Sequence, residues 1–498
     1  MTRRPAPCED GDVARQRSGA EGKSTVDSEA VEGHDVLTDT DRLAYRSLRK
    51  RPDTRAERYA LGRSLRQKVP RSSLGEWRVT RDGRDPVALV EDSHEGRVPE
   101  LVPVRVARMV ASPYGFLRGS AVVMADDVAG LAATGIMPVV CGDAHLGNVG
   151  FYASPERDLV LDLNDFDEAH PGSWEWDLRR LAASTWVAGR QNGSSEDDCE
   201  SAVRACAASY REEIRYLADQ PLFTRSFERI DMTRMREHAP DSPLTVELER
   251  AATRARERTS DRALPRFTTE RDGIRQIVEE PPLITRLSDA EADMLAEGLD
   301  EYLATLDPHW RRVLGGYTLV DVAHKVVGVG SVGLRAYVAL LEGSSGDDVI
   351  FLQLKQARRS VLARYVHGDS AWHRHQGERV VEYQQALQTV SDPLLGWTTV
   401  DGRQFYVRQF RNMKGSVSLD AISAGSLADY AGIAGHLLAK GHARTSGASM
   451  IAGYVGGSAK LDEAMARFAQ AYADQTEADH AALLAAVKSG RMPMADSA

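Results

Sequence analysis

The sequence predicts an α+β fold that is divided into two lobes. With 498 residues, the chain is longer than a single hydrophobic core usually organises. Residues 184–315 are mainly helical in pattern, whereas residues 316–415 contain short apolar, β-branched segments separated by glycine-rich turns. We therefore expect a mainly helical lobe over 39–315, a small β-rich lobe over 316–415, and helices over 416–498 that return to the large lobe.

The first lobe contains polar side chains in a pattern that suits phosphoryl transfer. The apolar run Gly135–Cys141 predicts a short buried strand, and Asp143 follows it in a tight Gly-Asp turn. Asn148 stands five positions later, and Asp165 and Asp167 follow a second apolar segment. Phosphoryl transfer needs Mg²⁺ ligands and a carboxylate that orients the attacking hydroxyl. We expect Asp143 to be this catalytic carboxylate, and Asn148, Asp165 and Asp167 to be candidate ligands of Mg²⁺.

The residues around these acids predict how their loop is held. Leu159–Leu163 predicts a strand that delivers Asp165 at its end. The string WEWDLRRLAAS predicts a helix near Asp177, which either caps this helix or accepts backbone hydrogen bonds that hold the loop of Asp143. His145 is expected to be a packed or hydrogen-bonded residue, because no His or Cys stands at a metal-ligand spacing from it.

The second lobe contains the glycine pattern G-x-G-x-x-G at Gly328, Gly330 and Gly333, with Ser331 inside it. In a dinucleotide-binding fold such glycines open a helix, whereas in a kinase-like fold they form a flap between two antiparallel strands. The residues that follow (LRAYVALL) are β-branched and aromatic enough to predict a strand. We therefore expect the flap, whose backbone N–H groups would bind the phosphates of ATP.

A lysine ends the third apolar strand of this lobe, which is expected over Val349–Leu354. Lys355 stands 22 positions after the last glycine of the flap, where a kinase-like fold has the lysine that pairs with the α- and β-phosphates. The chain contains nine Lys and 54 Arg, so a lysine at this position indicates a need for a compact charge. Glu378 and Glu382, one turn apart on the next expected helix, are candidate partners of Lys355, and Glu382 is the one we expect.

The order of these parts differs from that of an ordinary kinase, in which the flap and the lysine precede the catalytic loop. A circular permutation reconciles the two, because a chain can be reopened in a loop without changing its packed core. The following segments support it: a strand pair (Trp397–Thr399 and Phe405–Phe410), a polar hinge (Arg411–Ser416) and a helix (Ser426–Ala443) of the kind that leads into a catalytic loop. The sequence thus predicts a two-lobed, circularly permuted protein-kinase-like fold.

Four strings in the chain resemble a bacterial family catalogued as domain of unknown function 2252: CGDAHLGN, LNDFDEAHPGSWEWDLRRLAAS, KVVGVGSVGLRAYV and LQLKQA. This family resembles protein kinases and aminoglycoside phosphotransferases, as a distant and circularly permuted relative. This resemblance implies ATP binding, and it implies that Asp143 is the catalytic aspartate, Asn148 the metal-binding asparagine and Asp165 the metal-binding aspartate. The chain departs from those enzymes at Cys141, where they usually carry His, and at Asp167, where protein kinases carry Gly. The share of Asp165 and Asp167 in binding the metal therefore stays open.

Composition narrows the class of protein and its partners. The net charge of −10 argues against a broad nucleic-acid surface. The four cysteines show no paired spacing, which implies no disulfide framework, and no apolar run approaches the roughly 20 residues of a membrane helix. These features indicate a cytoplasmic protein without membrane or nucleic-acid partners. Residues 1–38 are polar and almost free of aromatic side chains, which predicts a disordered tail.

The expected function is that of an ATP- and Mg²⁺-dependent phosphotransferase whose acceptor is a small molecule with a hydroxyl group. Two alternatives remain open: a non-catalytic, nucleotide-binding regulatory protein, and an enzyme that transfers AMP. A dinucleotide oxidoreductase would need a helix after Gly333. Arg105, Arg108 and Arg118 are candidate contacts for phosphate or substrate, although nothing in their spacing separates them from surface arginines.

Overall fold

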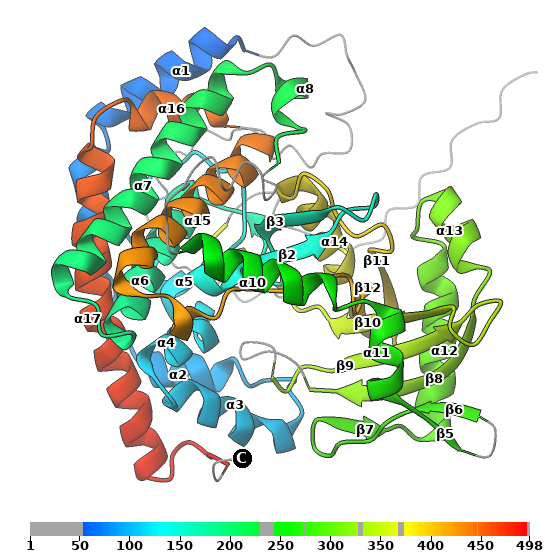
Figure 1. The fold of residues 1–498 in the computed structure, drawn as a ribbon. Helices are drawn as coiled ribbons and strands as arrows, with labels where there is room; N and C mark the ends of the chain where they lie inside the picture. Colours follow the sequence, from blue (N-terminus) through cyan, green and yellow to red (C-terminus); the bar gives the residue numbers. More distant parts are fainter. Residues whose placement is uncertain are drawn as a thin grey trace, which may run out of the picture.

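The computed structural model describes residues 53–229, 244–271, 274–326, 332–366, 373–445 and 447–495. Figure 1 shows a helical part on one side of the molecule and, on the other, a sheet with helices of its own. The predicted α+β class is therefore confirmed. The predicted tail over residues 1–38 lies outside the described residues, as do Gly328, Gly330 and Ser331 of the glycine pattern.

Long helices build the helical part around one hydrophobic core. They are α1 (Arg55–Ser64), α6 (Trp174–Gln191), α7 (Glu196–Asp219), α15 (Ala424–Thr445), α16 (Ala448–Val455) and α17 (Lys460–Lys488), with the shorter α8 (Leu222–Arg225) and α10 (Leu244–Arg256) beside them. α7 begins at a capping box, in which the Ser195 hydroxyl accepts from the backbone N–H of Asp198 and the Asp198 carboxylate accepts from Ser195. α15 confirms the helix expected over Ser426–Ala443. It lies along α7, and their facing side chains are almost all buried.

Short helices lie along α17. They are η2 (Leu65–Gln67) and η3 (Arg71–Gly75) near its N-terminal end, and α2 (Pro86–Asp92), α3 (Val102–Val110) and α4 (Pro113–Gly119) nearer its C-terminal end, with η4 (Pro99–Leu101) and α5 (Ala121–Ala129) beside these. Proline stands in the first turn of α2, α3 and α4, where its missing N–H leaves no intrahelical bond unmade. Val106, Phe116 and Leu483 are buried in the small core between these helices and α17. This core fixes α3 and α4, which reach the cavity described below.

An antiparallel sheet forms the centre of the other part. Its strand order is β11-β12-β10-β9-β8-β7, with β7 (Ile284–Arg286), β8 (Thr318–Lys325), β9 (Ala336–Glu342), β10 (Val349–Gln356), β11 (Gly396–Val400) and β12 (Arg403–Gln409). The strands predicted after Gly333, over Val349–Leu354 and in the segments 397–399 and 405–410 are confirmed. Because β9 is a strand paired antiparallel with β8, the chain lacks the helix that a dinucleotide-binding fold needs after the glycines.

The predicted boundary between the lobes at residue 315 is wrong. α12 (Asp289–Leu303) and α13 (Pro308–Leu314) cover one face of the sheet and share its core, in which Tyr302 is fully buried. α11 (Ser260–Phe267) and the hairpin of β5 (Thr268–Arg271) and β6 (Ile274–Ile277) pack on the sheet as well. The helical pattern of this region is real for α12 and α13, but an amphipathic pattern does not tell which sheet or bundle a helix will cover.

A hairpin and one helix connect the two parts. β2 (Val149–Ala153) pairs with β3 (Leu159–Leu163), which confirms the second predicted strand, and β1 (Val139–Val140) pairs with β4 (His170–Pro171). The backbone of Phe151 in β2 exchanges hydrogen bonds with Gly415 in the segment after β12, at 2.6 and 3.1 Å. α14 (Gln376–Leu387) contacts β11 and β12 on one side and α15 on the other. The remaining turns are η5 (Leu146–Asn148), η6 (Val361–Arg364) and η8 (Leu419–Ala421).

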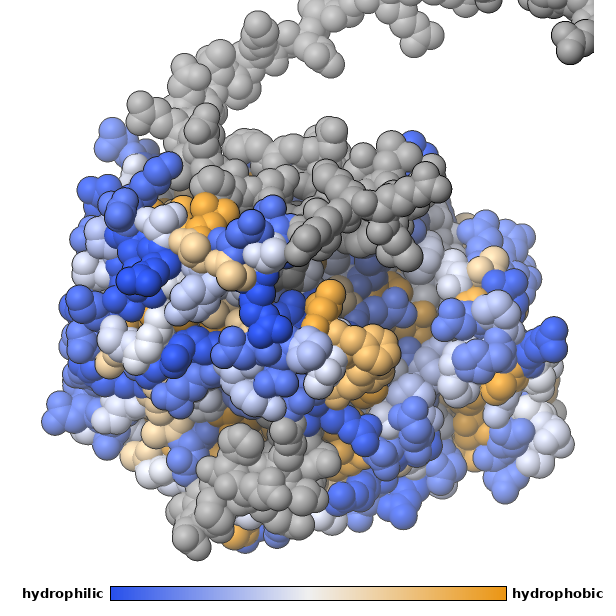
Figure 2. Space-filling model, turned by 90° about the horizontal axis from the view of Figure 1, so that it is seen from above, coloured by the Kyte–Doolittle hydropathy of each residue, from blue (hydrophilic) through white to orange (hydrophobic). Residues whose placement is uncertain are grey.

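The surface of the described residues is mainly hydrophilic on the face that Figure 2 shows, where hydrophobic side chains gather in small patches only. No helix among the described residues is both long enough and apolar enough to span a membrane. Cys141, Cys199 and Cys206 are buried free thiols.

Candidate active site

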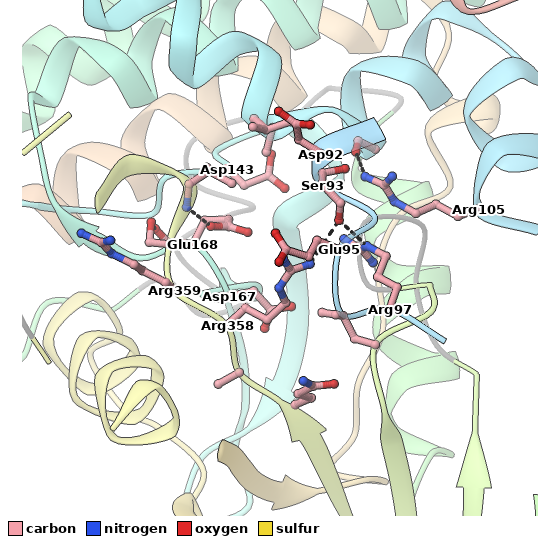
Figure 3. A pocket seen from close by; sticks show the side chains of 18 of the residues that line it. Asp92, Ser93, Glu95, Arg97, Arg105, Asp143, Asp167, Glu168, Arg358 and Arg359 are labelled. Atoms are coloured by element: carbon pink, nitrogen blue, oxygen red, sulfur yellow. Dashed lines mark hydrogen bonds between the residues drawn. The ribbon is translucent and has the colours of Figure 1, made fainter. Parts of the chain in front are cut away.

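A cavity of about 840 Å³ lies where the two parts of the molecule meet. Asp143, Asp165 and Asp167 line it from the helical part, and Leu334 and Gln356 line it from the ends of β9 and β10. Figure 3 shows Asp143 and Glu168 on one side of this cavity and Arg97 and Arg105 on the other. The three predicted carboxylates therefore lie close to the sheet in the structure, although the strands of the sheet come much later in the sequence.

The turn that carries Asp143 is held from beneath by Asp177. The backbone N–H groups of Cys141 and Gly142 donate to the two oxygens of Asp177, at 2.6 and 2.9 Å. The N-cap of α6 is Ser173, so of the two roles considered for Asp177 the loop-holding one is confirmed and the capping one is wrong. His442 on α15 contacts the same carboxylate at 3.2 Å. Asp177 therefore ties the turn to α6 and α15.

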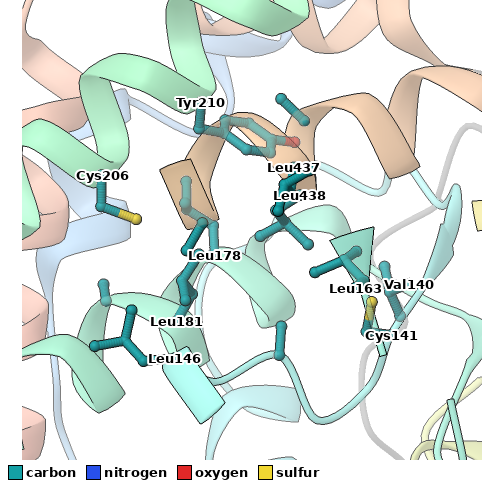
Figure 4. Packing of buried hydrophobic residues seen from close by; sticks show 14 of the residues in the cluster. Val140, Cys141, Leu146, Leu163, Leu178, Leu181, Cys206, Tyr210, Leu437 and Leu438 are labelled. Atoms are coloured by element: carbon teal, nitrogen blue, oxygen red, sulfur yellow. The ribbon is translucent and has the colours of Figure 1, made fainter. Parts of the chain in front are cut away.

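The flanks of this turn are embedded in the hydrophobic core. Figure 4 shows Val140 and Cys141 beside Leu163, and Leu146 beside Leu181 of α6, and all five side chains are buried. Gly142 between them has φ +75°, and a Cβ there would lie 2.3 Å from the carbonyl oxygen of Glu168. Only glycine fits this position without strain. The core thus fixes the loop, while the side chain of Asp143 keeps 19% of its surface exposed.

Asp143 has an arginine partner that sequence analysis did not identify. Arg180 on α6 forms an ion pair with its carboxylate and also donates to the carbonyl of Leu117 at 2.9 Å. Burial raises the pKa of Asp143 to about 7, although Arg180 acts in the opposite direction. A carboxyl group with a pKa near neutrality is suited to accept a proton as a general base. The sequence signal for Arg180 is the adjacent pair of arginines in the expected helix, and only burial distinguishes such a pair from surface charge.

Asn148 lies directly behind Asp143. Its Nδ2 donates to the main-chain carbonyl of Asp143 at 2.6 Å, and its side chain is 6% exposed. Its Oδ1 receives no hydrogen bond from the described residues, which leaves it free to bind a cation. Asn148 is not part of the cavity lining. Within the described ranges there is no group of three or more His, Cys, Asp or Glu side chains that could hold a metal by themselves. Mg²⁺ in nucleotide sites needs fewer protein ligands, because phosphates and water complete its coordination.

Lys355 meets the aspartates that follow β3. Its Nζ lies 2.5 Å from an oxygen of Asp167 and 4.0 Å from one of Asp165. Tyr406 donates to the other oxygen of Asp167 at 2.8 Å. Burial alone would lower the pKa of Lys355, but Asp165 and Asp167 outweigh it and raise this pKa. Burial would raise the pKa of Asp165, but Lys355 and Arg408 lower it, so that this carboxylate is ionised at neutral pH.

The structure corrects the predicted partner of Lys355. Glu382 is exposed on α14, whereas Asp165 and Asp167 form the ion pairs of the lysine. The residue of α14 that reaches the site is Arg379, which donates to the carbonyls of Asp167 and Arg358 at 2.8 Å and to that of Ala169. Arg379 is 1% exposed, so it holds the segment after Asp165 from within the core. The sequence did not indicate Arg379, because the expected partner of Lys355 was a carboxylate.

The last glycine of the predicted flap contacts the segment between α2 and α3. The N–H of Val98 donates to the carbonyl of Gly333 at 2.7 Å, and Arg97 donates to that of Val332 at 2.5 Å. Gly333 has φ +86°, and the side chain of Arg97 lies against it. The start of β9 is therefore attached to the helical part across one edge of the cavity.

Comparison with known proteins places the chain in a family. Residues 97–486 match the family described as "Uncharacterized protein conserved in bacteria (DUF2252)". The match covers most of the chain, from the segment before α3 to the end of α17, and the chain belongs to this family. The family resemblance drawn from the sequence motifs is thereby confirmed. No curated protein and no solved structure matches the chain.

Proposed function

We propose that the protein is an ATP- and Mg²⁺-dependent phosphotransferase with a circularly permuted, kinase-like fold. The observation that carries the proposal is the ion pair of the buried Lys355 with Asp167, at 2.5 Å, because Asp167 lines a cavity that Asp143 and Asp165 also line. Phosphoryl transfer requires a lysine for the phosphates, a metal-binding carboxylate and a hydroxyl-orienting carboxylate in one place. Residues nearly two hundred positions apart in the chain supply this set.

The order of the elements supports the kinase-like interpretation. β8, β9 and β10 are antiparallel neighbours, the glycine pattern lies between the first two, and Lys355 lies on the third. A helix, α14, then a strand pair, β11 and β12, and then the long α15 follow along the chain. An ordinary kinase continues from such a helix into its catalytic loop. In this chain the loop of Asp143 comes first, and α15 lies beside it through His442 and Asp177.

Each residue of the site has a distinct role in this proposal. Asp143 orients the acceptor hydroxyl and accepts its proton, and Arg180 holds the carboxylate in place. Lys355 binds the α- and β-phosphates, and Asp167 positions the lysine. Asn148 and Asp165 are the residues that would hold Mg²⁺, which when bound neutralises charge on the phosphate oxygens. Asp165 fits this role better than Asp167. The side chain of Asp165 is 43% exposed and lies 4.0 Å from the Nζ of Lys355, whereas Asp167 is held at 2.5 Å by Lys355 and at 2.8 Å by Tyr406.

The test is transfer of phosphate from ATP to components of a bacterial metabolite extract, followed by mass spectrometry of the products. Wild-type protein with Mg²⁺ is expected to add a phosphate to at least one hydroxyl compound, and Asp143→Asn to lower the rate about 10²- to 10⁴-fold. Asp158→Asn, on the exposed turn between β2 and β3, is the matched control and is expected to keep the wild-type rate. An added AMP would indicate nucleotidyl transfer. Binding of ATP with no product from any fraction would indicate a regulatory protein and would contradict the proposal.

A further inference from the structure

Four of the arginines that line the cavity come from the segments around α2, α3, α4 and the end of β10. We call them the arginine end: Arg97 in the segment between α2 and α3, Arg105 on α3, Arg118 on α4 and Arg358 just after β10. Figure 3 shows Arg97, Arg105 and Arg358 around the same hollow. The function proposed above gives none of them a role.

The hydrogen bonds of these arginines go to neutral carbonyl groups. Arg97 and Arg358 both donate to the carbonyl of Ser93, at 3.0 and 3.1 Å, and Arg105 donates to that of Gly119 at 2.6 Å. Among the ion pairs of the described residues, none involves a member of the arginine end. Two guanidinium groups thus share one carbonyl, and neither forms an ion pair with a carboxylate of the described residues.

Arg105 is the most deeply buried of the four. It is 2% exposed, and its Nε and Nη1 have no hydrogen-bond partner among the described residues, nor has the buried Nε of Arg118. Burial, and then Arg97 and Arg358, lower the pKa of Arg105, so neighbouring charges oppose the cation rather than support it. A buried cationic donor without an acceptor is costly, and native structures keep one chiefly where a ligand supplies the acceptor.

The carboxylates nearby do not fill this need. Asp92 and Glu95 also line the cavity, but both are exposed and neither forms an ion pair with the arginine end. Glu168 accepts the N–H of Val361 at 2.7 Å, and burial raises its pKa, although Arg379 and Arg358 act in the opposite direction. Asp143 is already paired with Arg180. We call Asp143, Asp165 and Asp167, which are paired with Arg180 or Lys355, the acidic end of the cavity, and the members of the arginine end form no such ion pair.

The position of the arginine end indicates which substrate it faces. Arg105 and Arg118 come from α3 and α4, and α4 packs on the catalytic loop, where the N–H of Gly147 donates to the hydroxyl of Tyr114 at 3.1 Å and Arg180 reaches Leu117. The nucleotide, in the proposal above, is held by the sheet and Lys355. Guanidinium groups bind phosphate through paired N–H donors.

We propose that the arginine end binds a phosphate group of the acceptor, so that the enzyme phosphorylates a hydroxyl of a small phosphate ester. The identification of the bound group as part of the acceptor rests on the phosphotransferase proposal. The anion-binding site itself rests only on the residues of the arginine end.

The test is calorimetric titration of inorganic phosphate into the full-length protein, alone and saturated with Mg²⁺ and a non-hydrolysable ATP analogue. Wild-type protein is expected to bind phosphate in both states. Arg358→Gln and Arg97→Gln are expected to weaken phosphate binding about tenfold or more, because each removes a charged donor. Arg105→Gln is a third variant, accepted only if its melting profile stays cooperative. Arg204→Gln, in an exposed pair on α7, is the control and is expected to bind as wild type does.

The outcomes separate this inference from the proposed function. It is overturned if wild-type protein does not bind phosphate, if phosphate and the nucleotide analogue exclude each other, or if Arg358→Gln weakens the analogue instead of phosphate. Lys355→Met is expected to weaken the analogue and leave phosphate binding within twofold. If phosphate binds through Arg358 while no nucleotide binds to the wild type, the anion site stands and the phosphotransferase proposal fails.

Discussion

The charged side chains at the two ends of the cavity differ in whether they have ion-pair partners within the protein. At the acidic end, Asp143 is paired with Arg180, Asp167 with Lys355 and Tyr406, and Asp177 beneath them accepts three hydrogen bonds. At the arginine end, guanidinium groups share carbonyls or leave donors unpartnered. The carboxylates of the acidic end are therefore paired within the protein, whereas the arginine end keeps buried donors without an acceptor among the described residues. The two proposals above assign preorganised catalytic groups to the first end and an anion-binding site to the second.

Of the two ends of the cavity, the acidic end should lose more stability when its cation is removed. Lys355→Met leaves Asp167 and Asp165 without their cation, and we expect the free energy of unfolding to fall by about 2 kcal/mol, a value kept low because both aspartates are partly exposed. The double variant Lys355→Met/Asp167→Asn should recover part of this loss. Urea denaturation measures both, with the exposed Lys460→Met as control. No recovery in the double variant would mean that the ion pair does not hold this end together.

Removing an arginine from the other end should change stability much less. We expect Arg105→Met, in phosphate-free buffer, to alter the free energy of unfolding by less than about 1 kcal/mol, because the lost bond to Gly119 is offset by relief of an unpartnered cation. Arg379→Met is the matched control, since that equally buried arginine makes bonds to three carbonyls, and it should cost about 3 kcal/mol. Equal losses in the two variants would remove the contrast between the ends.

The smallest effect concerns the pH dependence of stability near the arginine end. Burial, and then Arg105 and Arg97, lower the pKa of His94 to about 4. The unfolded chain, with an ordinary histidine pKa of about 6.5, binds the proton more readily. The free energy of unfolding should therefore decrease as the pH falls from about 6.5 towards 4. Urea denaturation at about pH 5 and 7 should show a drop that is smaller in His94→Gln by up to about 1 kcal/mol. Identical pH profiles would show that the arginines do not act on His94.

Local patterns in the sequence predicted much of the fold. The strands at 159–163 and 349–354 and the helix at 426–443 follow from short-range periodicity, and each was found within a few residues of its expected ends. The sequence could not predict that α12 and α13 cover the sheet, because their apolar faces could pack on a helix bundle as well as on a sheet.

The candidate site was only partly predictable. Asp143, Asp165, Asp167 and Lys355 stand at the ends of strands, where sequence position implies direction, and all four meet in the structure. The partner of Lys355 could not be inferred, since it depends on how the two parts of the molecule approach each other. Arg180, Arg379, Arg97 and Arg358 remained hidden because the chain has 54 arginines, and for the same reason spacing could not separate the candidates Arg105 and Arg118 from surface arginines.

The central claim is that residues from both parts of the chain form one Mg²⁺-dependent nucleotide site, and nucleotide titration with and without Mg²⁺ tests it most directly. We predict that ATP stabilises and binds the wild type in the presence of Mg²⁺, that NAD does not, and that Lys355→Met and Asp165→Asn each weaken ATP binding at least about tenfold. Binding of ATP with the same affinity in both variants, or preference for NAD, would contradict the account.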